Sequence, residues 1–346
     1  MQQWNRFSLA VRENHREWKN RVRPNETLAN EEDVESVGED EEESEEGRAI
    51  AGQKAIYKPT QDEWDEHMRT HIPFRRWCPY CVKGKCKSNP HGQSNKSSED
   101  LERETPVISF DYMGPKSKDD KSEKIDSLPI IIGIDRRHKW RIAHMVPKKG
   151  HDPHAIKMIA REIRISGYSK LTLKSDQEPA IRELLDAVKR ERTEPIDIML
   201  EESPVGEHKS NGEAENTAQV IQGQVRTLRL GMQARYQTTL RSDHPIMPWL
   251  IKHSALLINV CKVGEDGRTA WERRKGKKFK RQLPEIGECV WFLKALSEGK
   301  DKLDTRWEDG VFAGVREESG EIYVMSSQGV RKVRAYKRRP EGERWN

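Results

Sequence analysis

The sequence predicts a mixed α/β core, with a small metal-binding module before it and a small SH3-like antiparallel β-barrel after it. Strand-like apolar segments alternate with helical segments over residues 105–262, which is typical of a mixed sheet. Histidines and cysteines gather in residues 60–92, as in a small zinc module. Short strand-like segments separated by glycines fill residues 279–338, and this spacing favours a small barrel.

The composition indicates a basic chain with a disordered N-terminal region. Hydrophobic residues make up 34% and charged residues 35% of the 346 residues, so part of the chain is expected to lack a packed core. Residues 1–59 are predicted to be largely disordered, because residues 31–46 hold 11 acidic side chains and no basic one. The whole chain has a net charge of +5, so without these 11 negative charges the rest of the chain has a net charge of +16. Such a positive charge suits a nucleic-acid partner.

A membrane partner is not expected. No apolar run approaches the roughly 20 residues that cross a bilayer, and the first residues lack the apolar segment of a secretory signal. The five cysteines include one Cys-x-x-Cys pair, which in a reducing compartment indicates metal binding rather than a disulfide.

The predicted core is built from five strands and four helices. The strands are expected at 106–113, 128–135, 140–147, 171–176 and 196–200. The helices are expected at 153–166, at 178–191, from 212 to about 236, and around 246–260. Three strands followed by alternating helices and strands indicate a sheet with both antiparallel and parallel pairs.

Three carboxylates stand where such a sheet would carry a metal site. Asp111 lies inside an apolar strand, where an unpaired charge is costly. Asp176 directly follows another strand, and ligand sites of α/β sheets gather at such strand ends. Glu215 lies in the first turn of the long helix, with 38 residues between it and Asp176. A structural, hydrogen-bonded aspartate is the alternative interpretation of Asp111.

The long helix is predicted to have two distinct stripes. An apolar stripe is expected to face the core and consists of Ala214, Ala218, Ile221, Val225, Leu228 and Met232. A polar stripe, offset by one residue, consists of Glu215, Gln219, Gln222, Arg226 and Arg229. Glu215 would bind metal at the helix start, while the glutamines and arginines would contact DNA phosphates further along.

The sequence resembles retrotransposon and retroviral integrases from about residue 60 to 338. The resemblance is carried by HMRTHIPFRRWCPYC, ISFDYMGP, LTLKSDQEPAI and SPVGEHKSNGEAENTAQVIQGQVRTL, and the S-N-G-x-x-E string ending at Glu215 is its most specific part. It implies a ribonuclease H-like catalytic core in which Asp111, Asp176 and Glu215 form the catalytic triad. The interval between Asp176 and Glu215 is slightly longer than in retroviral enzymes.

The chemistry implied is integration of a retroelement, through DNA 3′-end processing and strand transfer. Two Mg²⁺ or Mn²⁺ ions held by the three carboxylates would activate the attacking oxygen and stabilise the leaving one. The partners implied are the element's DNA ends and target DNA, and the enzyme is expected to be a homo-oligomer. The alternative function is a catalytically inactive or domesticated integrase-derived protein that only binds nucleic acid.

Two ligand sets for a structural zinc ion compete in residues 60–92. His67 and His71 are four residues apart, and with Cys78 and Cys81 they make a His₂Cys₂ set, which we favour and which the resemblance supports. The second set combines Cys78 and Cys81 with Cys86 and His91 in zinc-knuckle spacing. The rings of Trp64, Phe74 and Trp77 are expected to form a small core around the ion.

The predicted barrel is flanked by two basic runs, RRKGKKFKR (273–281) and RKVRAYKRR (331–339). They are expected to bind DNA without sequence preference, and the side chains singled out for this are Lys277, Lys278, Lys280 and Arg281. Such runs are also typical of nuclear localisation signals. A protein made in the cytoplasm that acts on host DNA in the nucleus is therefore expected.

Overall fold

The computed structural model describes residues 56–86, 105–113, 128–191, 195–202, 212–294, 303 and 305–345. The chain divides into two compact units, Met1–Lys58 and Pro59–Asn346, and the fold described below belongs to the second. The predicted disorder of residues 1–59 and the acidic run at 31–46 lie almost wholly outside the described residues. Among the helices that the structure describes, none is long and apolar enough to cross a membrane.

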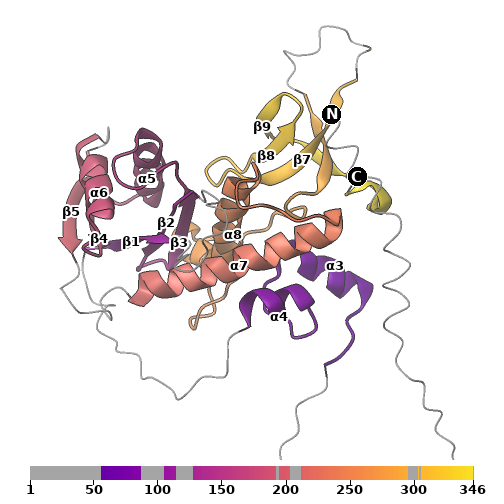
Figure 1. Ribbon diagram of the computed structural model, residues 1–346, viewed down its shortest axis with the longest axis horizontal. Helices are drawn as coiled ribbons and strands as arrows, with labels where there is room; N and C mark the ends of the chain where they lie inside the picture. The colour runs from indigo at the N-terminus through magenta and orange to yellow at the C-terminus, as the bar shows by residue number, and fades with distance from the viewer. Residues whose placement is uncertain are drawn as a thin grey trace, which may run out of the picture. The chain divides into compact units, whose positions relative to one another are not determined.

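The core sheet is mixed and has five strands in the order β3-β2-β1-β4-β5 (Figure 1). The strands are β1 (Val107–Met113), β2 (Ile130–Asp135), β3 (Trp140–Met145), β4 (Lys170–Ser175) and β5 (Asp197–Glu202). β1 pairs antiparallel with β2, and β2 with β3, whereas β1, β4 and β5 run parallel. The mixed α/β prediction is confirmed, and β1 occupies the central position.

Two helices cover each face of the core sheet. α5 (Pro153–Ser166) and α6 (Pro179–Glu191) share one apolar cluster with alternate residues of the strands, such as Phe110 of β1. The opposite face packs against α7 (Gly212–Tyr236) and α8 (Met247–Cys261), through contacts of Ile132 with residues such as Ile221. Burial on both faces explains why β1 and β2 are apolar almost throughout.

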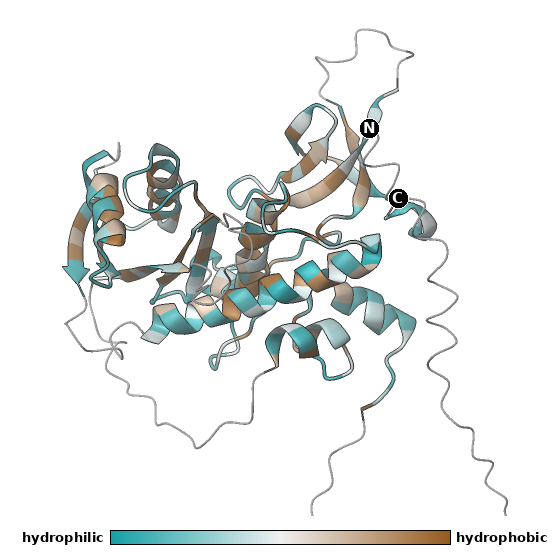
Figure 2. Ribbon diagram, viewed as in Figure 1, coloured by the Kyte–Doolittle hydropathy of each residue, from teal (hydrophilic) through white to brown (hydrophobic). Residues whose placement is uncertain are grey.

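The predicted apolar stripe of α7 is confirmed, since its six members are all buried or half-buried. Figure 2 shows polar and apolar residues alternating around this helix. A second face of α7 is also covered, because Gln224 and Thr227 are buried although they lie outside the stripe. The helix therefore packs on two sides.

The second partner of α7 is the N-terminal helix pair, α3 (Gln61–Thr70) and α4 (Pro79–Lys85). α3 begins with a capping box of Thr60 and Glu63, which satisfies free N–H groups at the helix start. The Gln224 side chain of α7 donates to the carbonyl oxygen of Thr70 at 2.7 Å. Glycines on both helices, Gly84 and Gly223, let α4 and α7 approach closely.

The C-terminal segment forms a separate antiparallel sheet of five strands in the order β10-β6-β7-β8-β9. The strands are β6 (Cys289–Leu293), β7 (Trp307–Val315), β8 (Ile322–Ser326), β9 (Gly329–Val333) and β10 (Tyr336–Arg338). The division of residues 329–338 into two short strands, β9 and β10, was not predicted from the sequence. A short helix, α9 (Ala270–Lys275), was also missed, because its sequence reads as part of a basic run.

The close approach of α4 and α7 makes Gly84 a sensitive position. A Cβ atom there would lie 2.9 Å from the backbone nitrogen of Thr227 and would overlap its Oγ1 atom. We expect Gly84→Ala to lower the free energy of unfolding by about 1–3 kcal/mol, because neither backbone can move away freely.

Chemical denaturation of the full chain measures this loss. Gly342→Ala is the matched control, since nothing lies within 4 Å of its Cβ position. Equal stability of the Gly84→Ala and Gly342→Ala variants would contradict tight packing between α4 and α7.

Candidate metal centres

The register of the central strands brings Asp111 and Asp176 together. β1 and β4 pair in parallel, with Val107 opposite Thr172 and Ser109 opposite Lys174, an offset of 65 residues. Asp111 and Asp176 are separated by the same 65 residues. They therefore lie across from each other just beyond the last paired residues, on strands that are about 4.8 Å apart.

A third carboxylate joins the two aspartates, and it is Glu178. Carboxylate oxygens of Asp111, Asp176 and Glu178 all lie within 4.8 Å of one another, close enough to share a metal ion. Glu178 directly precedes α6, and its backbone N–H donates to Asp176 at 3.2 Å. Its side chain also forms an ion pair with Lys149 at 2.6 Å. The sequence prediction missed Glu178, although its place two residues after Asp176 was a signal.

The electrostatics of this carboxylate cluster favour a bound cation. Burial and then the nearby carboxylate of Asp176 raise the pKa of Asp111 to about 6, and Glu178 and Glu215 contribute in the same direction. Like charges at this distance repel, and a divalent cation would remove the repulsion. Carboxylate oxygens are the ligands that Mg²⁺ and Mn²⁺ prefer. The donor set of this cluster therefore fits a hard divalent ion.

The two glutamates in the first turn of α7 have different surroundings. Glu213 forms ion pairs with Lys139 at 2.8 Å and with Arg136 at 3.4 Å. Glu213 is therefore held in ion pairs with two cations. Glu215 is exposed, and its charge contributes to the raised pKa of Asp111, but it is not a member of the three-carboxylate cluster.

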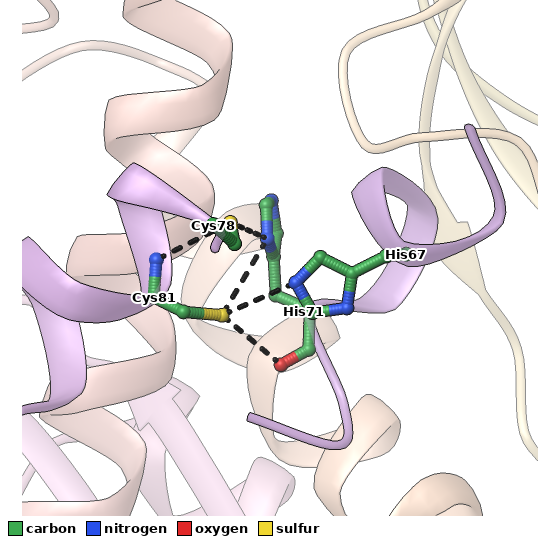
Figure 3. Close-up of side chains that lie close together, drawn as sticks. All are labelled: His67, His71, Cys78 and Cys81. Carbon is green, nitrogen blue, oxygen red and sulfur yellow. Dashed lines mark hydrogen bonds between the residues drawn. The ribbon is translucent and has the colours of Figure 1, made fainter. Parts of the chain in front are cut away.

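The favoured His₂Cys₂ set forms one compact, buried cluster (Figure 3). The Sγ atom of Cys81 lies 3.3 Å from Nε2 of His67 and 3.9 Å from Nδ1 of His71. The Sγ atom of Cys78 lies 3.5 Å from Nδ1 of His71. The four side chains converge, as tetrahedral coordination of a zinc ion requires.

Local structure explains how these four side chains meet. His67 is in α3, whereas His71 caps this helix in the left-handed conformation, with φ of 52°. Cys78 caps the start of α4 and Cys81 lies in its first turn. The helix therefore does not continue through both histidines; the chain turns at His71, and the ring of His71 points back toward the cysteines (Figure 3).

The protonation states of the cluster suit metal binding. Burial lowers the pKa of His71, which keeps its ring neutral and able to act as a ligand. The hydrogen bond from Cys78 lowers the pKa of Cys81, helped by His67 and His71. The same Cys78–Cys81 contact, together with burial, raises the pKa of Cys78.

The surroundings of the cluster differ in part from the prediction. Trp64 and Trp77 stack with ring centroids 5.6 Å apart and pack against the cluster, but Phe74 is exposed. Tyr80 takes part instead. In the competing zinc-knuckle set, Cys86 is exposed, and residue 91 lies outside the described residues.

The polar stripe of α7 is partly engaged in contacts within the protein. The guanidinium of Arg226 donates to the carbonyl oxygen of Gly84 at 3.1 Å, and that of Arg229 donates to the carbonyl oxygen of Leu240. Gln219 is exposed and Gln222 is half-buried. The glutamines thus lie between Glu215 at the start of the helix and arginines that hold neighbouring segments in place.

The four basic side chains selected from the run at 273–281 are all exposed. Lys277, Lys278, Lys280 and Arg281 follow α9 and precede β6. Together with the turn between β7 and β8 they line a groove of about 470 Å³. Arg281 reaches across this groove and donates to the carbonyl oxygen of Gly320.

No protein-family model matches this sequence, and no curated protein matches it. Among solved structures, the chain is similar to one from the cryo-EM structure of a simian T-cell lymphotropic virus intasome in complex with the PP2A regulatory subunit B56 gamma. The identity is 13% and the TM-score 0.32, over 68% of this chain and 81% of that chain. A likeness this low leaves the function to be argued from the residues of this chain.

The zinc ligand set makes a prediction about metal content. The full chain is expected to bind one zinc ion per molecule, and Cys81→Ser or His67→Ala should abolish it, since three remaining ligands hold zinc far more weakly. Elemental analysis after dialysis gives the stoichiometry. Cys86→Ser is the matched control and should keep the ion. Loss of zinc in Cys86→Ser with retention in His67→Ala would show that the knuckle set is the correct one.

The raised pKa of Asp111 makes a prediction about stability and pH. A carboxyl group that holds its proton more tightly in the folded protein stabilises the fold at low pH, and this contribution is lost as the pH rises through about 6. At pH 8 the ionised Asp111 costs up to about 3 kcal/mol. Without divalent ions, Asp111→Asn should therefore raise the melting temperature at pH 8, and the gain should shrink toward pH 4.5.

Asp243→Asn is the control for this measurement, because the hydrogen bond from Arg241 lowers the pKa of Asp243. That variant should gain no stability at pH 8. Adding Mg²⁺ or Mn²⁺ should stabilise the wild type more than Asp111→Asn. An unchanged melting temperature for Asp111→Asn at both pH values would contradict charge repulsion in the carboxylate cluster.

Proposed function

We propose that this protein is a divalent-metal-dependent DNA integrase that processes DNA 3′ ends and joins them to target DNA. The observation that carries the proposal is the position of Asp111, in the central strand β1, beside Asp176, which directly follows the end of the adjacent parallel strand β4. Ligand sites of α/β sheets lie at such strand ends. A ribonuclease H-like core is proposed on the same strand order.

Glu215 is proposed as the third catalytic carboxylate. Its charge acts on Asp111, its side chain is exposed, and no ion pair within the described residues holds it. Glu213, which is the alternative in the same turn, is neutralised by Lys139 and Arg136. Glu178 is the competing third ligand, and it would have to loosen its ion pair with Lys149 to bind a metal ion in full.

Different residues of this chain would bind the metal ions and the DNA in phosphodiester transfer. Asp111, Asp176 and Glu215 would hold two Mg²⁺ or Mn²⁺ ions, which supply activation of the attacking oxygen and charge stabilisation at the leaving oxygen. The nucleophile is water in end processing and a DNA 3′-hydroxyl in strand transfer. Gln219 and Gln222 continue from Glu215 along α7 and would contact the DNA backbone.

The flanking parts are proposed to organise the DNA complex. The module of residues 60–92 would hold a structural zinc ion, and the segment 279–338 would be an SH3-like barrel that binds DNA. The lysines at 277, 278 and 280 are exposed cations that suit phosphate contacts. The core would span residues 105–262, a homo-oligomer would act on two DNA ends, and the protein would work in the nucleus after synthesis in the cytoplasm.

The test is a DNA-joining assay with labelled DNA ends, a plasmid target and Mg²⁺ or Mn²⁺. Asp111→Asn, Asp176→Asn and Glu215→Gln are each expected to lower end processing and joining by roughly 100-fold or more, since each removes a metal ligand. DNA binding in a mobility-shift assay should stay nearly unchanged. Glu213→Gln is the matched control in the same helical turn and should keep most activity.

Comparison of Glu178→Gln with Glu215→Gln identifies the third ligand. If activity survives in Glu215→Gln and is lost in Glu178→Gln, the third metal ligand is Glu178 and not Glu215. A wild-type protein that binds DNA and never joins it, with either ion, would contradict the enzyme proposal and leave the integrase-derived binding protein.

A further inference from the structure

The groove beside α9 contains unpaired polar atoms as well as surface charge. One side is the segment Lys277–Arg281, and the other is the turn between β7 and β8, including Glu317. Its volume of about 470 Å³ lies within the range of about 300–1,000 Å³ that is usual for small-molecule sites. Trp271 and Phe279 also line it, with their ring centroids 5.1 Å apart and their planes nearly perpendicular.

Two residues that line the groove each have a buried polar atom without a hydrogen-bond partner among the described residues. These atoms are the indole Nε1 of Trp271, a donor, and the carboxylate Oε2 of Glu317, an acceptor. A buried polar atom without a partner destabilises the folded protein. A ligand that supplies both an acceptor and an N–H donor would remove that cost.

The charges of the groove indicate where an anionic group would lie. Lys277 and Lys280 form no ion pair within the described part of the chain, so their ammonium groups are available to a phosphate. Glu318 is held by Arg161 at 2.8 Å and Arg316 at 2.9 Å, and its charge is largely neutralised. The lysine side of the groove is therefore positive, while Glu317 makes the inner part unfavourable for a bare phosphate.

We propose that this groove binds one unpaired nucleotide of a DNA strand, with the base beside Glu317 and Trp271 and the phosphate among the lysines at 277, 278 and 280. The Glu317 carboxylate accepts a hydrogen bond from an amino group of the base, and the Trp271 indole donates to an acceptor on its edge. Guanine offers a carboxylate two adjacent donors, its N1–H and its amino group, whereas thymine has no amino group and offers only its ring N3–H. Phe279 and Trp271 offer aromatic surface for stacking.

This site rests on the proposed function only in taking DNA as the ligand. It uses none of the carboxylates near Asp111 and needs no divalent ion. A variant can therefore lose nucleotide binding and keep DNA joining, and another can lose DNA joining and keep nucleotide binding. The two proposals can be tested separately.

The environment of Glu317 makes the affinity for the base depend on pH. Burial and the neighbouring Glu162 raise the pKa of Glu317 to about 7, against the opposite influence of Lys252, Arg274 and Arg161. Glu162 itself is paired with His144 at 3.0 Å. The ionised carboxylate is the better acceptor, so affinity for an amino-bearing base is expected to rise between pH 6 and pH 8.

The experiment is calorimetric titration of the full-length protein with dGMP, dTMP and inorganic phosphate at pH 8, in EDTA. We expect dGMP to bind about tenfold more tightly than dTMP or phosphate, since a hydrogen bond to a charged group is involved. Glu317→Gln keeps the shape and removes the charge, and should reduce the preference for dGMP over dTMP to about twofold or less. It should also abolish the rise in affinity between pH 6 and pH 8.

Further variants separate the base from the phosphate. Trp271→Phe keeps an aromatic ring without the N–H and should weaken dGMP binding while leaving phosphate binding unchanged. The double change of Lys277 and Lys280 to Ala should weaken all three ligands, whereas Lys332→Ala, an exposed lysine on β9, should weaken none. Asp111→Asn should bind dGMP like the wild type, even if it cannot join DNA.

Three results would overturn the proposal. The first is absence of dGMP binding to the wild type. The second is equal affinity for dGMP, dTMP and phosphate, which would mean a general anion surface. The third is an oligoglutamate peptide that displaces dGMP and binds Glu317→Gln as well as the wild type, which would mean that the groove takes an acidic peptide.

Discussion

The parallel pairing of β1 with β4 is the constraint on which the candidate carboxylate site depends. The three strands β3, β2 and β1 could form an antiparallel sheet by themselves, but Asp111 would then have no carboxylate beside it. The crossover through α5 returns the chain along β1, and the 65-residue register sets Asp176 next to Asp111. A slip of one residue in this pairing would point one of the two side chains toward the opposite face of the sheet.

α7 connects this site to the rest of the described unit. Its apolar stripe packs on the sheet, while a second face accepts α3 and α4 through Gly84 and Gln224. Gly231 lies close to the ring of His71, with its Cβ position 3.4 Å from Nε2. The same helix therefore carries Glu215 at its start and packs against the His₂Cys₂ cluster further along. If a metal ion bound at that cluster were lost, the packing of the helix that carries Glu215 would change.

Hydrophobic periodicity was enough to predict the core elements, but it carried little information about long-range polar contacts. The five core strands were predicted within two residues at each end, and burial on both faces explains the continuous apolar runs of β1 and β2. The pairing of Glu213 with Lys139 joins residues 74 positions apart, and no local pattern encodes it. Arg226 was assigned to a polar face correctly, yet periodicity cannot say that α4 covers this face. Glu178 was missed for a different reason. The prediction considered only Asp176, which directly follows the strand, whereas Glu178 lies two residues further along, just before α6.

The distribution of charge explains why the site residues could not be chosen by helix geometry alone. Glu213 and Glu215 flank the apolar stripe equally, so their spacing cannot separate a ligand from a structural ion pair. The two glutamates differ in their surroundings in the structure. Two cations neutralise Glu213, whereas the charge of Glu215 helps to raise the pKa of Asp111. A fold selected for stability alone would neutralise both. Asp111 and Asp176 lie close together without an ion pair among the described residues, which destabilises the protein, and a divalent cation would relieve this repulsion. The cost in stability is therefore itself an argument that the cluster serves to bind metal.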